Sequence, residues 1–76
     1  MSAQLKEIIT NNIAILYQKL EWARKNGARE TTQFILGQIS GYSDCIKLFY
    51  DKELADKIID SAIELSVTGV YGYETI

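Results

Sequence analysis

Three carboxylates near the C-terminal end of the chain have a spacing that groups them. Asp56, Asp60 and Glu64 follow one another at four-residue steps, so a helix would align them along one side. Grouped carboxylates can bind a hard cation or perform acid–base chemistry. Metal sites in helical bundles draw ligands from several helices and commonly include histidine, so a solvated face is the simpler interpretation. The alternative is an acidic stripe that docks on a basic surface of a second copy or of another protein.

Residues for nucleophilic or metal chemistry are scarce. The chain has no histidine and one cysteine, Cys45, which excludes a His-assisted nucleophile, a zinc-type ligand set and an intrachain disulfide. Gly69 and Gly72 follow the last predicted helix, so they do not form a glycine-rich phosphate loop that opens a helix. Cys45 falls on a predicted apolar face, where a cysteine is commonly an inert buried hydrophobe. We therefore predict no catalytic residue, metal ligand or cofactor, and a protein that is not an enzyme.

The sequence RKNGAR contains the strongest basic cluster. Arg24, Lys25 and Arg29 surround a predicted turn between two helices. The free N–H groups at the start of the second helix add to the positive potential, so this basic corner is a candidate site for a phosphate or an acidic side chain. Tyr17 is a candidate aromatic partner for such a ligand, although three basic residues at a loop are also common on ordinary surfaces.

The helix predicted over about residues 3–26 has the clearest pattern. Its apolar residues recur at three- and four-residue steps, which is the spacing of one helix face, and they are Leu5, Ile9, Ile13, Leu16, Leu20 and Ala23. Ser2 is a suitable N-cap, and Gly27 can take the left-handed conformation that ends a helix.

A second apolar row runs along the same helix. Ile8, Ile15 and Trp22 are spaced seven residues apart and lie roughly 80 to 100° around the helix from the main row. The apolar arc is wider than one antiparallel neighbour requires, so we expect the helix to contact two neighbours. The second neighbour is either another helix of the same chain or a second subunit. Asn12, between the rows, is a candidate register-setting residue.

A second helix is predicted over about residues 29–50 and a third over about 52–66. The apolar side of the second helix contains Phe34, Ile35, Ile39, Tyr42, Cys45, Ile46 and Phe49. A helix continued through Asp51 would place the later apolar residues roughly 160° from that side, so we expect a break there. Asp51 is a suitable N-cap for the third helix, and Glu53 and Lys57 form a supporting i,i+4 pair.

Two glycines interrupt the pattern of the second helix. Each interior glycine costs about 0.8 to 1 kcal/mol relative to alanine, so Gly37 and Gly41 call for a compensating role. The interpretation we favour is a close contact with another helix, for which the row of Ile8, Ile15 and Trp22 is the matching surface. The alternatives are a kink at Ser40 and Gly41, or a groove for a ligand.

Together these elements predict an all-α fold. A small antiparallel helical hairpin plus a third helix would form a three-helix mini-bundle, with a short irregular tail over residues 67–76. With no repeat, linker or low-complexity segment, residues 1–76 are expected to form a single helical domain. A chain of 76 residues is near the lower limit for a core without disulfides, metal or oligomerisation, so we expect a homo-oligomer, a dimer or higher.

Charge and composition narrow the partners. The net charge is −2, which argues against a protein that coats nucleic acid. Residues 1–29 carry a net charge of +3 and residues 30–76 a net charge of −5, which can be neutralised within one bundle or between chains. No membrane-spanning or signal segment is expected, and a lone thiol suits the cytoplasm. Most of the eight aromatic side chains are expected in the core.

Two classes of function remain. The first is a homo-oligomeric interaction protein that binds and modulates a partner protein as an inhibitor or adaptor. The second is a ligand-binding or sequestering module that holds a small phosphorylated molecule or nucleotide at a subunit interface. The size, acidity and lack of catalytic residues also resemble those of accessory proteins of bacteriophages or mobile elements.

Overall fold

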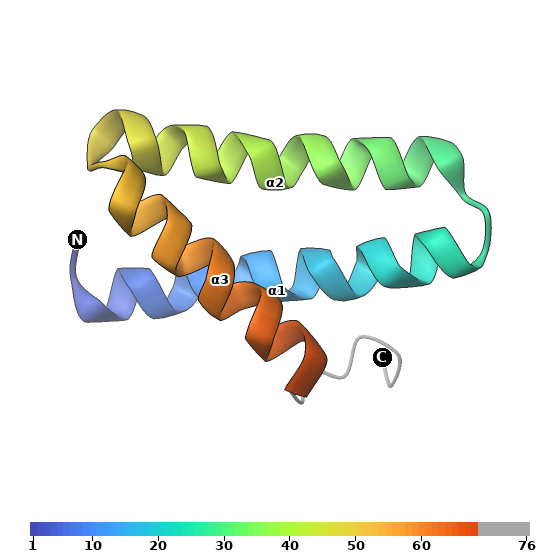
Figure 1. Cartoon of the computed structure of the whole chain (residues 1–76), viewed down its shortest axis with the longest axis horizontal. Helices are drawn as coiled ribbons and strands as arrows, with labels where there is room; N and C mark the ends of the chain where they lie inside the picture. The colour runs from blue at the N-terminus through green and yellow to red at the C-terminus, as the bar shows by residue number, and fades with distance from the viewer. Residues whose placement is uncertain (69–76) are drawn as a thin grey trace.

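Three helices make up the computed structural model, which describes residues 1–68. The helices are α1 (Ala3–Lys25), α2 (Arg29–Phe49) and α3 (Lys52–Thr68), and no strand occurs in the described range (Figure 1). The prediction of an all-α fold is confirmed. Because α3 continues to Thr68, it is longer than the 52–66 expected, and the remainder of the predicted tail lies outside the described residues.

The ends of α1 follow from local chemistry. The Ser2 side chain accepts a hydrogen bond from the Leu5 N–H at 3.1 Å, which satisfies one of the free N–H groups of the first turn. At the other end, the Asn26 side-chain amide donates to the Trp22 carbonyl at 2.8 Å. Gly27 then adopts a positive φ of 67°, a conformation that is strained for other residues. The chain can therefore reverse within three residues and start α2.

The break between α2 and α3 is capped by Asp51. Its Oδ1 atom accepts a hydrogen bond from the Leu54 N–H at 2.6 Å, as expected of an N-cap. The Lys57 ammonium lies 3.4 Å from the Glu53 carboxylate, but both side chains are largely exposed. A helix pair of this kind contributes only about 0.3 to 0.5 kcal/mol. The change of chain direction therefore depends mainly on the packing of α3.

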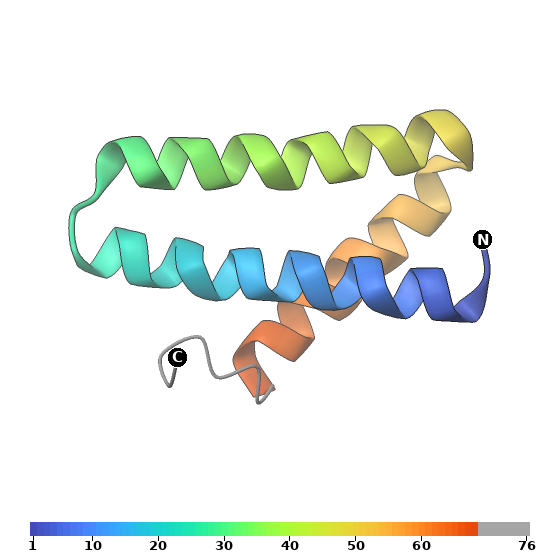
Figure 2. The same ribbon diagram turned by 180° about the vertical axis from the view of Figure 1, so that it is seen from behind.

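The helices form two layers. Helices α1 and α2 run antiparallel as a hairpin, and α3 crosses α1 obliquely on one face of that hairpin (Figure 1). Seen from behind, α1 and α2 lie in front and α3 lies behind them (Figure 2). Among the described residues, no helix covers this second face of the hairpin. The third helix therefore supplies a core on one side only.

The core is built from isoleucines and small residues. Ile13 of α1 and Ile58 of α3 are fully buried, and Ile35, Ile39 and Ile46 provide the buried side of α2. Four buried alanines, two on α1 and two on α3, are fully inaccessible: Ala14, Ala23, Ala55 and Ala62. Small side chains allow helix axes to approach closely, which suits the extensive contact between α1 and α3.

The predicted burial of three α2 residues is wrong. Phe34 is 68% exposed, Phe49 is 75% exposed, and Cys45 is exposed as well. The reason is the one-sided position of α3, because the covered arc of α2 is limited to the isoleucine side. The broader prediction that most aromatic residues lie in the core is also wrong for the described residues, where Tyr17 and Tyr42 are partly buried and the others are exposed.

Candidate interaction surfaces

An apolar groove lies between the start of α1 and the end of α2. It has a volume of about 450 Å³ and is lined mainly by apolar side chains, among them Leu5, Ile9, Tyr42, Cys45, Ile46 and Phe49. Gln38 contributes the side-chain amide, Gly41 lies in the wall, and no residue of α3 takes part. The groove therefore belongs to the hairpin alone. The groove alternative for the two glycines anticipated the α2 wall at Gly41, but not the α1 wall, which lies some forty residues away in the chain.

The two α2 glycines face open space. A Cβ atom built on Gly37 or Gly41 would meet nothing within 4 Å apart from its own helix, so neither glycine admits a close contact inside the chain. Helix α2 also runs without interruption from Arg29 to Phe49, so the chain does not break at Ser40 and Gly41. Within residues 1–68 the close contact predicted for these glycines is therefore absent.

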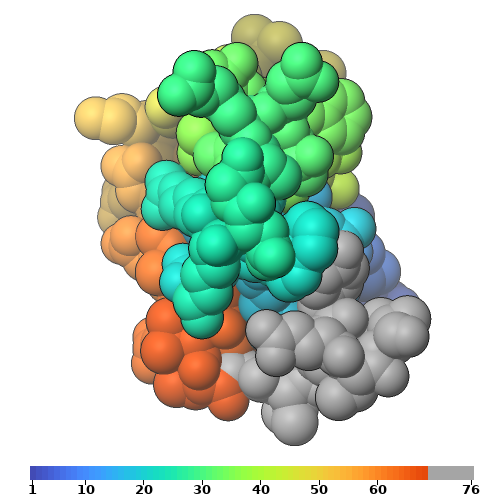
Figure 3. Space-filling view, turned by 90° about the vertical axis from the view of Figure 1, so that its right-hand side faces the viewer, coloured from blue at the N-terminus to red at the C-terminus, as the bar shows by residue number. Residues whose placement is uncertain are grey.

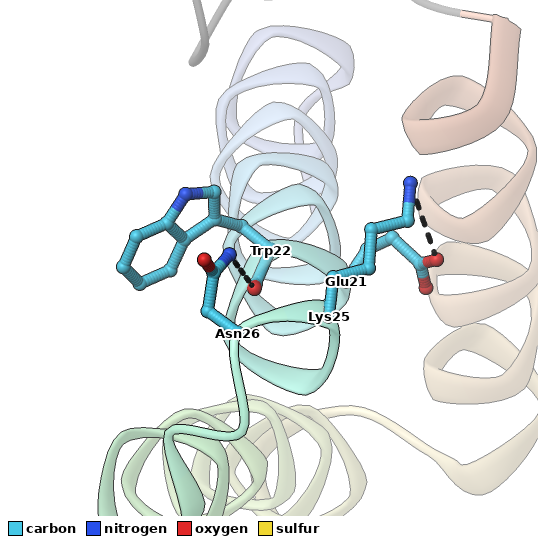
Figure 4. Close-up of polar contacts among 4 residues, drawn as sticks. All are labelled: Glu21, Trp22, Lys25 and Asn26. Carbon is cyan, nitrogen blue, oxygen red and sulfur yellow. Dashed lines mark hydrogen bonds and ion pairs between the residues drawn. The ribbon is translucent and has the colours of Figure 1, made fainter.

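The second apolar row of α1 is only partly covered. Ile8 is 50% exposed, Trp22 is 45% exposed, and Ile15 is partly buried. Helix α1 contacts both α2 and α3, as the same-chain interpretation expected, and residues outside its main row, such as Ala14 and Tyr17, lie in or against the core. In Figure 4 the Trp22 ring points away from α3, whereas the Glu21 and Lys25 side chains lie on the side that faces α3. The exposed part of the row, Ile8 and Trp22, therefore remains available for contact with a second subunit.

The basic corner does not converge on a site. Arg24, Lys25 and Arg29 are all exposed, and the Lys25 ammonium lies 3.9 Å from the Glu21 carboxylate (Figure 4). Figure 3 looks onto this end of the molecule, where the turn between α1 and α2 projects toward the viewer. None of the three residues lines the apolar groove. The corner is thus an exposed positive surface.

Tyr17 lies close to the Asp60 carboxylate of α3. Burial and the nearby Asp60 carboxylate both raise the pKa of the Tyr17 hydroxyl above its ordinary value, with burial the larger cause. The side chain therefore lies between α1 and α3, next to a negative charge. This environment favours the neutral phenol and opposes a phosphate, so Tyr17 gives no support to the phosphorylated-ligand interpretation.

The acidic stripe lies on the outer surface of α3. Asp56, Asp60 and Glu64 are exposed there, together with Ile63, which is 42% exposed, and Val67, which is 80% exposed. We call these five residues the α3 outer surface. Within residues 1–68 no three acidic or cysteine side chains come together as a metal site would require. The arrangement is an apolar strip bordered by carboxylates.

Comparisons with known proteins found no match. No family model, curated protein or solved structure matches this chain. Over residues 1–68, none of the helices combines the length and the apolar character needed to cross a bilayer. The fold and surfaces define a three-helix domain with two exposed surfaces of different chemistry: an uncharged one on the hairpin and an acidic one on α3.

Proposed function

We propose that this protein is a small, non-enzymatic, homo-oligomeric helical interaction protein that binds and modulates a partner protein. The supporting observation is the α3 outer surface, where Ile63 and Val67 are exposed beside three carboxylates. Interfaces commonly combine an apolar centre with a polar rim, and complementary charge selects the partner and speeds association. The partner therefore presents an apolar patch with basic residues around it.

Repulsion within the acidic stripe supports the same role. Carboxylates at four-residue spacing repel one another by a few tenths of a kcal/mol per pair on an exposed helix. Such repulsion weakens the free protein slightly and is relieved when a basic partner binds. An inhibitor or adaptor works in this way without any catalytic residue, because its effect depends on which surface of the partner it covers.

The first prediction concerns this surface. A tagged chain in which Asp56, Asp60 and Glu64 are changed to Asn, Asn and Gln is expected to lose basic partners that the unmodified chain captures from its source cells. The matched control changes Glu7, Glu21 and Glu53 to glutamine, which removes the same charge elsewhere and leaves capture intact. Quantitative mass spectrometry compares the captured proteins. Equal capture by all three chains, or capture of no specific protein, would contradict the proposal.

A further inference from the structure

Five exposed residues of α2 are arranged symmetrically about Gly41. Phe34 and Leu48 lie seven residues before and after it, and Gly37 and Cys45 lie four residues before and after it. At about 100° per residue these five positions fall within an arc of roughly 80° centred on Gly41. Phe34 is 68% exposed and Leu48 is 78% exposed. Between these two positions no charged residue falls within the arc, which we call the α2 stripe.

We propose that the α2 stripe packs antiparallel against the α2 stripe of a second copy, with Gly41 on the two-fold axis. The inference rests on the homo-oligomer in the proposed function and specifies its contact. In an antiparallel two-fold pair, a residue a given number of steps before the axis faces the residue the same number of steps after it. Phe34 then faces Leu48 of the second copy, Gly37 faces Cys45, and Gly41 faces its own counterpart.

The absence of charge on the α2 stripe favours a second copy of this chain as its partner. In an isologous contact each patch meets itself, so any net charge on the patch is doubled and repels. The α3 outer surface and the basic corner would each repel their own copies, whereas the α2 stripe carries no charge.

The glycines gain a function in this arrangement. Among the described residues, no atom outside α2 lies within 4 Å of a Cβ position at Gly37 or Gly41, so no contact in residues 1–68 compensates for the helix stability lost at the two glycines. Small residues at Gly37, Gly41 and Cys45 let two helix backbones approach closely, with a larger apolar side chain at either end of the stripe. Because the order of side-chain sizes is the same in both directions, antiparallel pairing sets large residues against large ones and small residues against small ones.

The apolar groove adjoins the stripe on one side. Gly41 and Cys45 belong to both, and Phe49 lines the groove next to them. Phe34 lies on the same side of Gly41 as the groove. The two-fold operation places the groove sides of both copies on the same side of the contact. Phe34 of the second copy therefore reaches the mouth of the groove beside Cys45 and Phe49. The contact thus covers exposed apolar surface of the groove as well as of the stripe.

The register can be tested with thiols. Helix axes about 8 to 10 Å apart, with Cα atoms about 2.3 Å from each axis, place facing Cα atoms about 3.4 to 5.4 Å apart, a range that overlaps the disulfide distances. That separation is compatible with a disulfide, for which Cα atoms usually lie about 4.4 to 6.8 Å apart. The native Cys45 and its counterpart are eight residues apart along the pair, about 12 Å, which is too far.

The second prediction uses single-thiol chains. In a Cys45→Ser background, Gly41→Cys is expected to form a disulfide-linked dimer as the main species in a glutathione redox buffer, whose oxidised form accepts the two electrons released. The matched control, Ser40→Cys, is exposed and adjacent but points about 100° away, so it stays unlinked. With native Cys45 retained, Gly37→Cys is expected to link to Cys45 of the second copy. Non-reducing gels and intact mass measure the products, and circular dichroism verifies the helices.

The outcomes separate this contact from the homo-oligomer itself. Equal linkage of the Gly41→Cys and Ser40→Cys chains, with a dimeric mass for the unmodified chain, would overturn the α2 contact and leave the homo-oligomer standing. Efficient linkage of native Cys45 to its counterpart would indicate parallel helices and would also overturn the contact. A monomeric mass for the unmodified chain at every concentration would overturn both the contact and the homo-oligomer.

Discussion

Replacing Ile58 by alanine is expected to unfold a large fraction of the protein. The Ile58 side chain is fully buried where α3 packs on the hairpin. Removing a buried isoleucine side chain of this kind typically costs about 2 to 5 kcal/mol, because the cavity left behind closes only partly. A domain this small has only about 3 to 5 kcal/mol from its core. Urea denaturation followed by circular dichroism would measure the loss of unfolding free energy.

A second variant in the same helix serves as the control. Ile63 is 42% exposed, so Ile63→Ala removes the same atoms from a partly solvated position. We expect a smaller loss of unfolding free energy, because less apolar surface returns to water and no closed cavity forms. Equal losses for the two variants would contradict the packing of α3 described above, because that packing distinguishes the two positions.

Replacing Leu48 by glutamate is expected to abolish self-association while the single chain stays folded. Leu48 is 78% exposed in the chain, so a carboxylate there remains solvated in the monomer. In the α2 contact the same carboxylate is desolvated without a partner, a situation that typically costs about 3 to 5 kcal/mol. Because each two-fold dimer contains two such carboxylates, its dissociation constant should rise by at least about four orders of magnitude. Sedimentation equilibrium measures the constant, and circular dichroism confirms the fold.

The facing residue provides a rescue. Phe34→Lys alone should also dissociate the dimer, but in a chain that carries both Phe34→Lys and Leu48→Glu each lysine faces a glutamate of the second copy. Partial recovery of self-association is expected, because the charges are now paired. Val67→Glu is the matched control, since Val67 is 80% exposed on α3 and outside the contact. Recovery that fails, or dissociation caused by Val67→Glu, would show that the register or the surface is wrong.

The helix ends were predictable because local chemistry determines them. Ser2 and Asp51 were recognisable as N-caps from their residue types and from the start of an apolar row, and each accepts the hydrogen bond expected of it. Gly27 was recognisable because few other residues adopt a positive φ without strain. The turn after α2 was indicated by the shift in the apolar phase at Asp51, which a continuous helix could not accommodate.

The exposure of Phe34, Cys45 and Phe49 was not predictable from periodicity. A helical pattern shows which residues share an arc, but not how many neighbouring helices cover that arc. Here α3 covers one face of the hairpin, so the buried arc of α2 narrows to Ile35, Ile39 and Ile46 and the rest of its apolar side faces outward. On α1 the width of the apolar arc was informative, because α2 and α3 leave part of that arc, at Ile8 and Trp22, exposed.

The two surfaces were predictable to different degrees. The four-residue spacing of Asp56, Asp60 and Glu64 was sufficient to place all three on one side of α3. A groove at the α2 glycines was one of the alternatives, and Gly41 lines it, but its α1 wall was not foreseeable because Leu5 and Cys45 meet only once the hairpin has formed. Gly37 and Gly41 were recognised as a weak point of the helix, but only the structure showed that no helix among residues 1–68 packs closely against them.

The solution mass of the unmodified chain tests the homo-oligomer most directly. Sedimentation equilibrium over a wide range of concentrations gives this mass and its concentration dependence under native conditions. An isologous α2 contact predicts a reversible rise from the chain mass of 8.6 kDa to twice that value. A mass of 8.6 kDa at every concentration would contradict the homo-oligomer and, with it, the α2 contact.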